Sequence, residues 1–232
     1  NPYQSVWVQD GLIYGFSGTW DNGSKQLNWH LTYPLGSPDV QLNILEKYPE
    51  KNRKIFSFEV LDKGRAISKG KIEAKHRSGA QKEKGVSSSP SPEIARLGRE
   101  GVWRESQTIP HDDGSIVIKG QSRMRWTRDG RALINEGVLY TEGRPEYYLW
   151  VKTWDAVGKL YRYAYFFEDG PVHHYVGEWN PVSESIKWQS THPEGAIVIT
   201  ESLKQPDKRT WTVMVKEGKW VTQGSGESWF YK

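Results

Sequence analysis

Glu136 is the carboxylate whose setting in the sequence most favours a chemical role. In a predicted strand it shares parity with Ile134 and Val138, so we expect its side chain on the inner, apolar face. A carboxylate in that place needs a cation or another hydrogen-bonding partner, which Arg123 or Arg125 on the preceding strand could supply. Glu136 and Arg123 are therefore candidates for holding a ligand head group, with Glu136 as a general base if a reaction occurs. The structural alternatives are an internal salt bridge or a Glu at a strand bulge beside Gly137.

Aromatic side chains that recur at every second position supply the rest of the candidate site. The run 147–154 is apolar on both parities, and a second aromatic series follows on the next predicted strand. If these faces point inward, they line a cavity for a flat or apolar ligand; if they point outward, they form an interface. The candidate ligand-binding aromatic residues are Trp126, Tyr148, Trp150, Tyr163 and Tyr165.

Signatures of metal and nucleophilic chemistry are missing from the sequence. It contains no Cys, which excludes disulfides, thiolate catalysis and iron–sulfur clusters. His173 and His174 are neighbours on a predicted strand, so their side chains point to opposite faces. The six His residues form no metal-binding spacing. We therefore predict no metal centre, no cofactor and no catalytic residue, and we favour a binding protein over an enzyme.

The elements that must position these residues are short strands. Apolar and polar residues alternate with a period of two, as in 116–126 and 161–167, and pairs such as Asp129-Gly130 and Glu142-Gly143 punctuate the runs. This pattern predicts an all-β antiparallel meander or up-and-down barrel. A single short helix is expected from Pro92. No stretch approaches the roughly 20 apolar residues of a membrane helix.

An internal repeat relates the two ends of the chain. A shift of 159 positions gives nine identities between residues 10–36 and 169–195, including the pairs Gly18/Gly177 and Trp20/Trp179. Residues 1–77 thus correspond to the second half of the unit that ends the chain. Such a half barrel leaves a free sheet edge, and we expect the other unit, another copy of the chain or a missing segment to complete it. Residues 78–91 are rich in Ser, Pro and Gly, which predicts a flexible linker.

The stretch 92–232 resembles bacterial lipocalin-like (calycin-type) proteins of unknown function. The matching motifs are Gly101-Val102-Trp103 after a short helix, the run 126–137, and Gly177-Glu178-Trp179. The resemblance implies an antiparallel barrel with a cavity, and residues 1–77 form a partial second copy. It implies structural roles for Gly101, with the helix passing close by, and for Trp103 as a plug of the barrel floor. Family members commonly end on Arg, whereas this chain ends on Lys232.

These observations leave three classes of function open. The first is non-catalytic binding of a small apolar or aromatic ligand by the barrel. The second is a structural or assembly protein with a filled barrel and a self-associating half-repeat, and the third is an acid–base enzyme that uses Glu136. The net charge of +4 is spread among acidic residues, so we expect no nucleic-acid partner. We expect a soluble protein and leave its compartment open, including export with the signal peptide already removed.

Overall fold

The computed structural model describes residues 3–9, 11–33, 40–50, 53–75, 89–167, 172–191, 196–217 and 219–232. The chain divides into two compact units, residues 1–9 with 13–85 and residues 10–12 with 86–232. Residues 78–88, which make up most of the linker predicted at 78–91, lie outside the described residues. Most described residues are in antiparallel strands and the one helix is a single short turn, so the predicted all-β class is confirmed.

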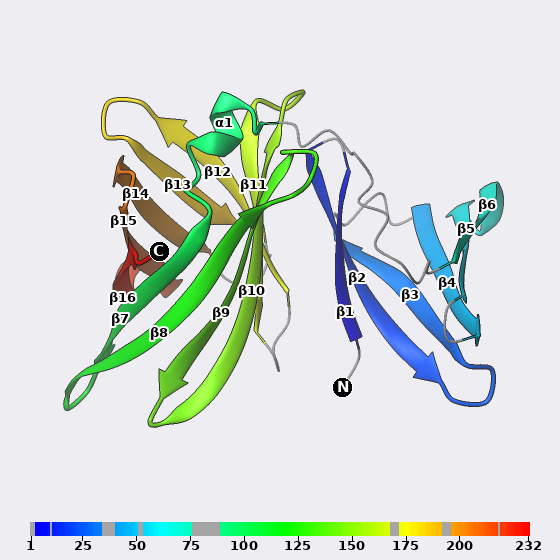
Figure 1. Ribbon diagram of the computed structural model, residues 1–232, viewed down its shortest axis with the longest axis horizontal. Coiled ribbons are helices and arrows are strands. Elements are labelled where there is room, and N and C mark those ends of the chain that lie inside the picture. Colours follow the sequence, from blue (N-terminus) through cyan, green and yellow to red (C-terminus); the bar gives the residue numbers. More distant parts are fainter. Residues whose placement is uncertain are drawn as a thin grey trace. The chain divides into compact units, whose positions relative to one another are not determined.

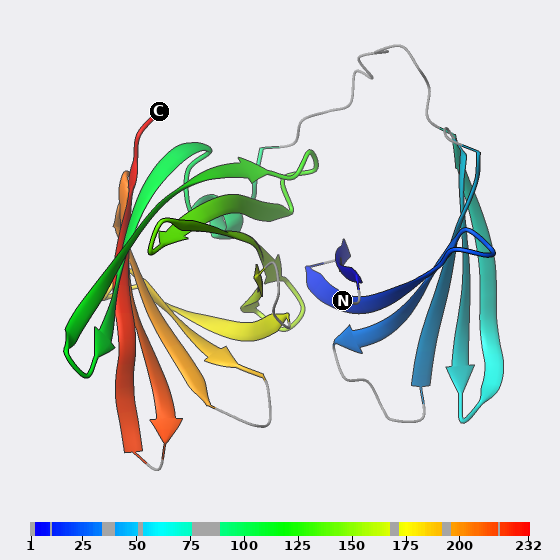
Figure 2. The ribbon, with the colours of Figure 1, turned by 90° about the horizontal axis from the view of Figure 1, so that it is seen from below.

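The second unit is a closed antiparallel barrel of ten strands (Figures 1 and 2). Figure 2 shows the strands following one another around a ring, from β7 in green to β16 in red. The ring closes where β16 pairs with β7, with Phe230 opposite Trp103. The strands are β7 (Gly101–His111), β8 (Gly114–Trp126), β9 (Ala132–Thr141), β10 (Arg144–Asp155), β11 (Leu160–Phe167), β12 (His173–Asn180), β13 (Ser185–Ser190), β14 (Ile197–Gln205), β15 (Lys208–Glu217) and β16 (Lys219–Phe230).

Tight turns explain how successive strands stay in register. Glu142 and Gly143, between β9 and β10, both have positive φ, at 51° and 78°. This is the backbone of a type I′ hairpin, whose twist matches that of the flanking strands. The turn places Thr141 opposite Arg144 and carries the pairing on to Thr153 opposite Ala132. It therefore fixes which residues of β10 face the interior.

A short helix, α1 (Pro92–Ala95), lies over one end of the barrel (Figure 1). Ser91 caps it and Pro92 occupies its first turn, as the sequence predicts. Ile94 and Leu97 turn into the barrel core beside Trp103, and all three are almost fully buried. The α1 end of the barrel is thus filled by its own side chains.

The first unit is a six-stranded antiparallel sheet in sequential order from β1 to β6. Its core is the buried group Phe16, Leu27, Trp29 and Ile44. The observed sheet agrees with the predicted additional half-barrel repeat. The strands are β1 (Tyr3–Gln9), β2 (Leu12–Asp21), β3 (Gln26–Tyr33), β4 (Val40–Glu50), β5 (Arg53–Asp62) and β6 (Arg65–Lys75). Within the described ranges, the structure contains no helix long and apolar enough to cross a membrane.

Candidate functional site

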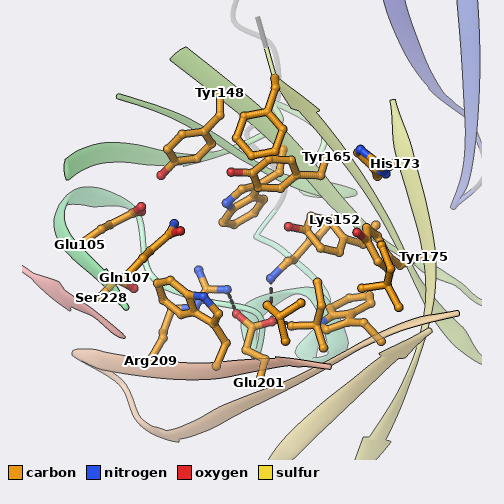
Figure 3. A pocket seen from close by; sticks show the side chains of 18 residues that line it. Glu105, Gln107, Tyr148, Lys152, Tyr165, His173, Tyr175, Glu201, Arg209 and Ser228 are labelled. Atoms are coloured by element: carbon orange, nitrogen blue, oxygen red, sulfur yellow. Dashed lines mark hydrogen bonds and ion pairs between the residues drawn. The ribbon is translucent and has the colours of Figure 1, made fainter. Parts of the chain in front are cut away.

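A cavity of about 320 Å³ lies inside the ten-stranded barrel (Figure 3). Its volume falls at the lower end of the roughly 300–1,000 Å³ that ligand pockets occupy. Inward-facing residues of β7 and of all the strands from β10 to β16 line it. Most of its wall is aromatic or aliphatic, so an apolar molecule could be taken out of water there.

The aromatic wall is held in a fixed arrangement by ring contacts between neighbouring strands. Tyr148 on β10 stacks on Tyr165 of β11, with ring centroids 5.6 Å apart and planes 7° apart. Tyr163 stacks on Tyr175 at 5.1 Å and meets the edge of Trp150 at 6.2 Å. Such offset and edge-to-face pairs add stabilisation beyond simple area burial. The wall therefore presents rigid, flat surfaces to the cavity.

A buried ionic cluster forms the polar part of the cavity wall. The Glu201 carboxylate on β14 accepts a hydrogen bond from Lys152 Nζ at 2.7 Å and one from Trp188 Nε1 at 2.9 Å. Its other oxygen accepts from Arg209 Nη2. The side chains of Lys152, Glu201 and Arg209 are each at most 5% exposed. Figure 3 shows both cations turned toward the Glu201 carboxylate.

Arg209 is held in the cluster but is not fully satisfied. Its Nη1 meets the Met124 sulfur at 3.3 Å, and its buried Nε has no hydrogen-bond partner among the described residues. Burial lowers the pKa of Arg209 to about 10, while the nearby Glu105 carboxylate opposes that shift. The guanidinium is thus a buried cation whose Nε–H donor makes no hydrogen bond to the described residues. An unmade buried hydrogen bond of this kind costs roughly 1–3 kcal/mol.

Burial governs the titration of the other polar groups in the cavity. Desolvation first, and then the charge of Arg209, holds the pKa of Lys152 well below its usual value. Desolvation also raises the pKa of Tyr175 to about 12 and the pKa of Tyr163 well above its usual value. These phenols therefore stay neutral at physiological pH and can donate or accept hydrogen bonds.

A second polar group, around Glu105, also borders the cavity. Glu105 on β7 is buried and accepts a hydrogen bond from Ser122 Oγ at 2.7 Å. Asn135 on β9 is fully buried between Tyr148 and Trp150. Its amide is satisfied when its oxygen accepts from Trp150 Nε1 at 2.9 Å and its nitrogen donates to Ser122 Oγ at 3.0 Å. These bonds fix the orientation of the aromatic wall.

The structure brings four of the seven predicted ligand-binding residues together at the cavity. Tyr148, Trp150, Tyr163 and Tyr165 all line it. Trp126 is partly buried and packs against the barrel core, outside the described lining of the cavity. The placement of the four aromatic residues agrees with the prediction; their role in binding stays a prediction.

The predicted inner-face position of Glu136 is wrong, and Arg123 does not turn inward either. Glu136 is 54% exposed at its side chain and pairs on the surface with Arg125, 2.5 Å away. Arg123, opposite Glu136 in the β8–β9 register, is also exposed. The inward residues of this strand include Leu133 and Asn135. The prediction failed because apolar residues occupy both faces of β9, so their parity does not distinguish the inner face from the outer one. The inner face also carries a polar residue, Asn135.

The motif residues of the family resemblance occupy structural positions. Trp103 is fully buried and donates from Nε1 to the Arg99 carbonyl at 3.1 Å. Gly101 has φ +138°, and a Cβ there would overlap the Phe230 ring. The close neighbour of Gly101 is therefore the C-terminal segment. The expectation that the short helix passes close to Gly101 is wrong. The same segment completes barrel closure, since Val102 N donates to the Lys232 carbonyl at 2.6 Å.

The repeat is visible in side-chain detail in both units. A Cβ on Gly177 would overlap the Trp188 ring, and a Cβ on Gly18 would lie 2.5 Å from the Trp29 ring. Trp179 is partly buried beneath the Arg96 guanidinium, 4.8 Å from its ring centroid. Trp20 is 38% exposed and its Nε1 donates to Asn22. Each glycine is therefore required by the Trp ring that crosses it.

The ionic cluster also has a counterpart in the first unit. Trp29 Nε1 donates to Glu46 at 2.9 Å, and Lys54 forms an ion pair with the same carboxylate. Tyr48 donates to its other oxygen at 2.5 Å. Trp–Glu–cation clusters at matching places in the two units indicate that the cluster belongs to the duplicated scaffold.

Lys152, Glu201 and Arg209 were not among the predicted site residues. Lys152 shares the parity of Trp150, Glu201 that of Ile199, and Arg209 that of Trp211, so each lies in an inward series. The sequence feature that could have identified these three residues is a charged side chain at a position where the alternation predicts an inward-facing apolar one. The contact between Lys152 and Glu201 could not be predicted from the sequence pattern, because 49 residues separate them.

Comparisons with known proteins give no family for this chain. No family model matches the sequence, and no curated protein matches it significantly. Among solved structures, the S-type phycobiliprotein lyase CPES from Guillardia theta is similar at 10% identity and a TM-score of 0.44, over 67% of this chain and 99% of that one. A protein of unknown function from the DUF3598 family of Nostoc punctiforme is similar at 11% identity and a TM-score of 0.39, over 100% of this chain and 96% of that one. Likeness at this level carries no argument about function.

Proposed function

We propose that the barrel of the second unit binds a small, flat, apolar or aromatic molecule that carries one hydrogen-bond-accepting group. The observation that supports this is the cavity of about 320 Å³, whose aromatic wall meets a buried cation with an unpaired donor. The apolar part of the ligand would stack among Tyr148, Trp150 and Tyr163. Its acceptor would face the Arg209 guanidinium, which lines the cavity.

Two observations bear on the other functions considered. An internal cavity disfavours a barrel filled by its own side chains, which an assembly-only protein would have. Glu136 lies on the outer surface, so acid–base chemistry in the cavity cannot depend on it.

A pair of neighbouring variants on β14 tests the proposal. Ile199 lines the cavity, whereas Thr200 is exposed on the outside of the same strand. In Ile199→Trp the new ring fills part of the cavity, and Thr200→Trp adds the same ring outside. Calorimetric titration with 2-naphthalenemethanol should give binding that weakens at least about tenfold in Ile199→Trp, a loss of roughly 1.4 kcal/mol, and is unchanged in Thr200→Trp. Equal binding by both variants, or no binding by the unmodified chain, would contradict it.

A further inference from the structure

Lys152 places a primary amine inside the cavity among aromatic rings. The residue is 3% exposed, and its Nζ lies 4.5 Å from the Trp150 ring centroid, 4.8 Å from that of Tyr163 and 5.1 Å from that of Trp188. Its ion-pair partner is Glu201, at 2.7 Å. Lysine is rarely buried to this extent without a reason in structure or function.

Neutralising Glu201 does not by itself require a charged lysine. The carboxylate also binds the Arg209 guanidinium, and arginine keeps its proton under ordinary conditions. Arg209 and Glu201 therefore balance one another. Glu105 is the other carboxylate in the cavity and favours the charged form of Lys152, whereas burial and Arg209 favour the neutral form and outweigh it. A lysine in a desolvated pocket beside another cation is the setting in which its amine becomes a nucleophile.

We infer that Lys152 forms an imine with an aldehyde or ketone bound in the cavity. This inference rests on the proposed function and names the class of ligand that the same site would take. The aromatic wall would hold the body of the carbonyl compound against Nζ. The Arg209 guanidinium, which also lines the cavity, would be the donor that polarises the carbonyl oxygen.

The step balances without an oxidant or reductant. The Nζ lone pair attacks the carbonyl carbon, a C–N bond forms, and the electrons of the C=O π bond move to oxygen, giving a carbinolamine after proton transfer. The C–O bond then breaks, and the oxygen leaves as water with two hydrogens that come from the amine. Glu201, 2.7 Å from Nζ, is placed to carry a proton between nitrogen and oxygen and to stabilise a protonated imine.

Trapping with a reductant tests the inference on the full chain. The protein is incubated with 2-naphthaldehyde and sodium cyanoborohydride, and the adduct is located by peptide mass mapping. We expect Lys152 to be labelled at least tenfold faster than any exposed lysine, such as Lys187. Labelling spread over exposed lysines without preference for Lys152 would overturn the inference.

Matched variants and a carbonyl-free probe separate this inference from the proposed function. Lys152→Met should lose the fast adduct, whereas Lys187→Met should keep it. Lys152→Met leaves Glu201 bound to Arg209 and Trp188, so we expect this variant to fold. The peptide mass map of the labelled, unmodified protein tests the inference even if the variant does not fold. If 2-naphthalenemethanol binds but Lys152 is not trapped, the imine is overturned and the proposed function stands. If the alcohol does not bind and no adduct forms at Lys152, both are overturned.

Discussion

Replacing Glu201 with Gln should strongly destabilise the barrel. The change keeps side-chain size and an acceptor for Trp188, but it leaves the Arg209 guanidinium without its counter-ion and takes the carboxylate partner away from Lys152. Their side chains are each 4% exposed, so water cannot replace the lost partner. Removing one member of a buried ion pair typically costs about 3–5 kcal/mol. We expect about 3 kcal/mol, the lower end, because Lys152 can release its proton whereas Arg209 cannot.

Glu136→Gln is the matched control. It makes the same chemical change in a Glu–Arg pair, but Glu136 and Arg125 are more than half exposed, and such pairs contribute about 0–1 kcal/mol. Urea unfolding should be followed by hydrogen exchange mass spectrometry of peptides from β10, β14 and β15, because these report on the barrel alone. A Glu201→Gln variant as stable as Glu136→Gln would refute the reasoning about the buried cluster.

Two further predictions concern acid stability and packing. Burial, assisted by the charge of His173, lowers the pKa of His174 from 6.5 to about 3, so the unfolded chain binds the proton first as the pH falls. The stability this confers is complete above pH 6.5 and is lost toward pH 3, by roughly 2–3 kcal/mol between pH 7 and pH 4. His174→Gln should reduce this pH dependence in urea unfolding, whereas the exposed His111→Gln should leave it unchanged. Gly177→Ala should cost about 1–3 kcal/mol, because the new methyl group would overlap the Trp188 ring; a melting temperature no lower than that of the exposed-turn variant Gly23→Ala would contradict this.

The strand pattern made the architecture and much of the cavity wall predictable. The aromatic series in 147–154 and 161–167 made Tyr148 and Tyr163 candidates for an inward face, with an outward-facing interface as the alternative, because large rings at every second position favour burial. These inferences use only the neighbours of a residue along its own strand, which a sequence displays directly.

The polar half of the site could not be predicted in the same way. Glu201 and Arg209 are charged residues in inward series, and they are tolerated there only because each satisfies the other. That compensation is a tertiary contact, which period-two patterns do not contain. Glu136 shows the converse error: apolar neighbours of the same parity suggested burial, but the pleat of β9 turns that face outward.

Methyl NMR of isoleucine-labelled protein with 2-naphthalenemethanol would test most directly the claim that the barrel interior binds a small molecule. Ile197 and Ile199 line the cavity, whereas Ile67 and Ile72 are exposed on β6 of the other unit. The account predicts saturable shift changes concentrated on the methyl groups of Ile197 and Ile199, with intermolecular contacts from the naphthalene protons. Changes confined to Ile67 and Ile72, or no saturable change at all, would contradict it.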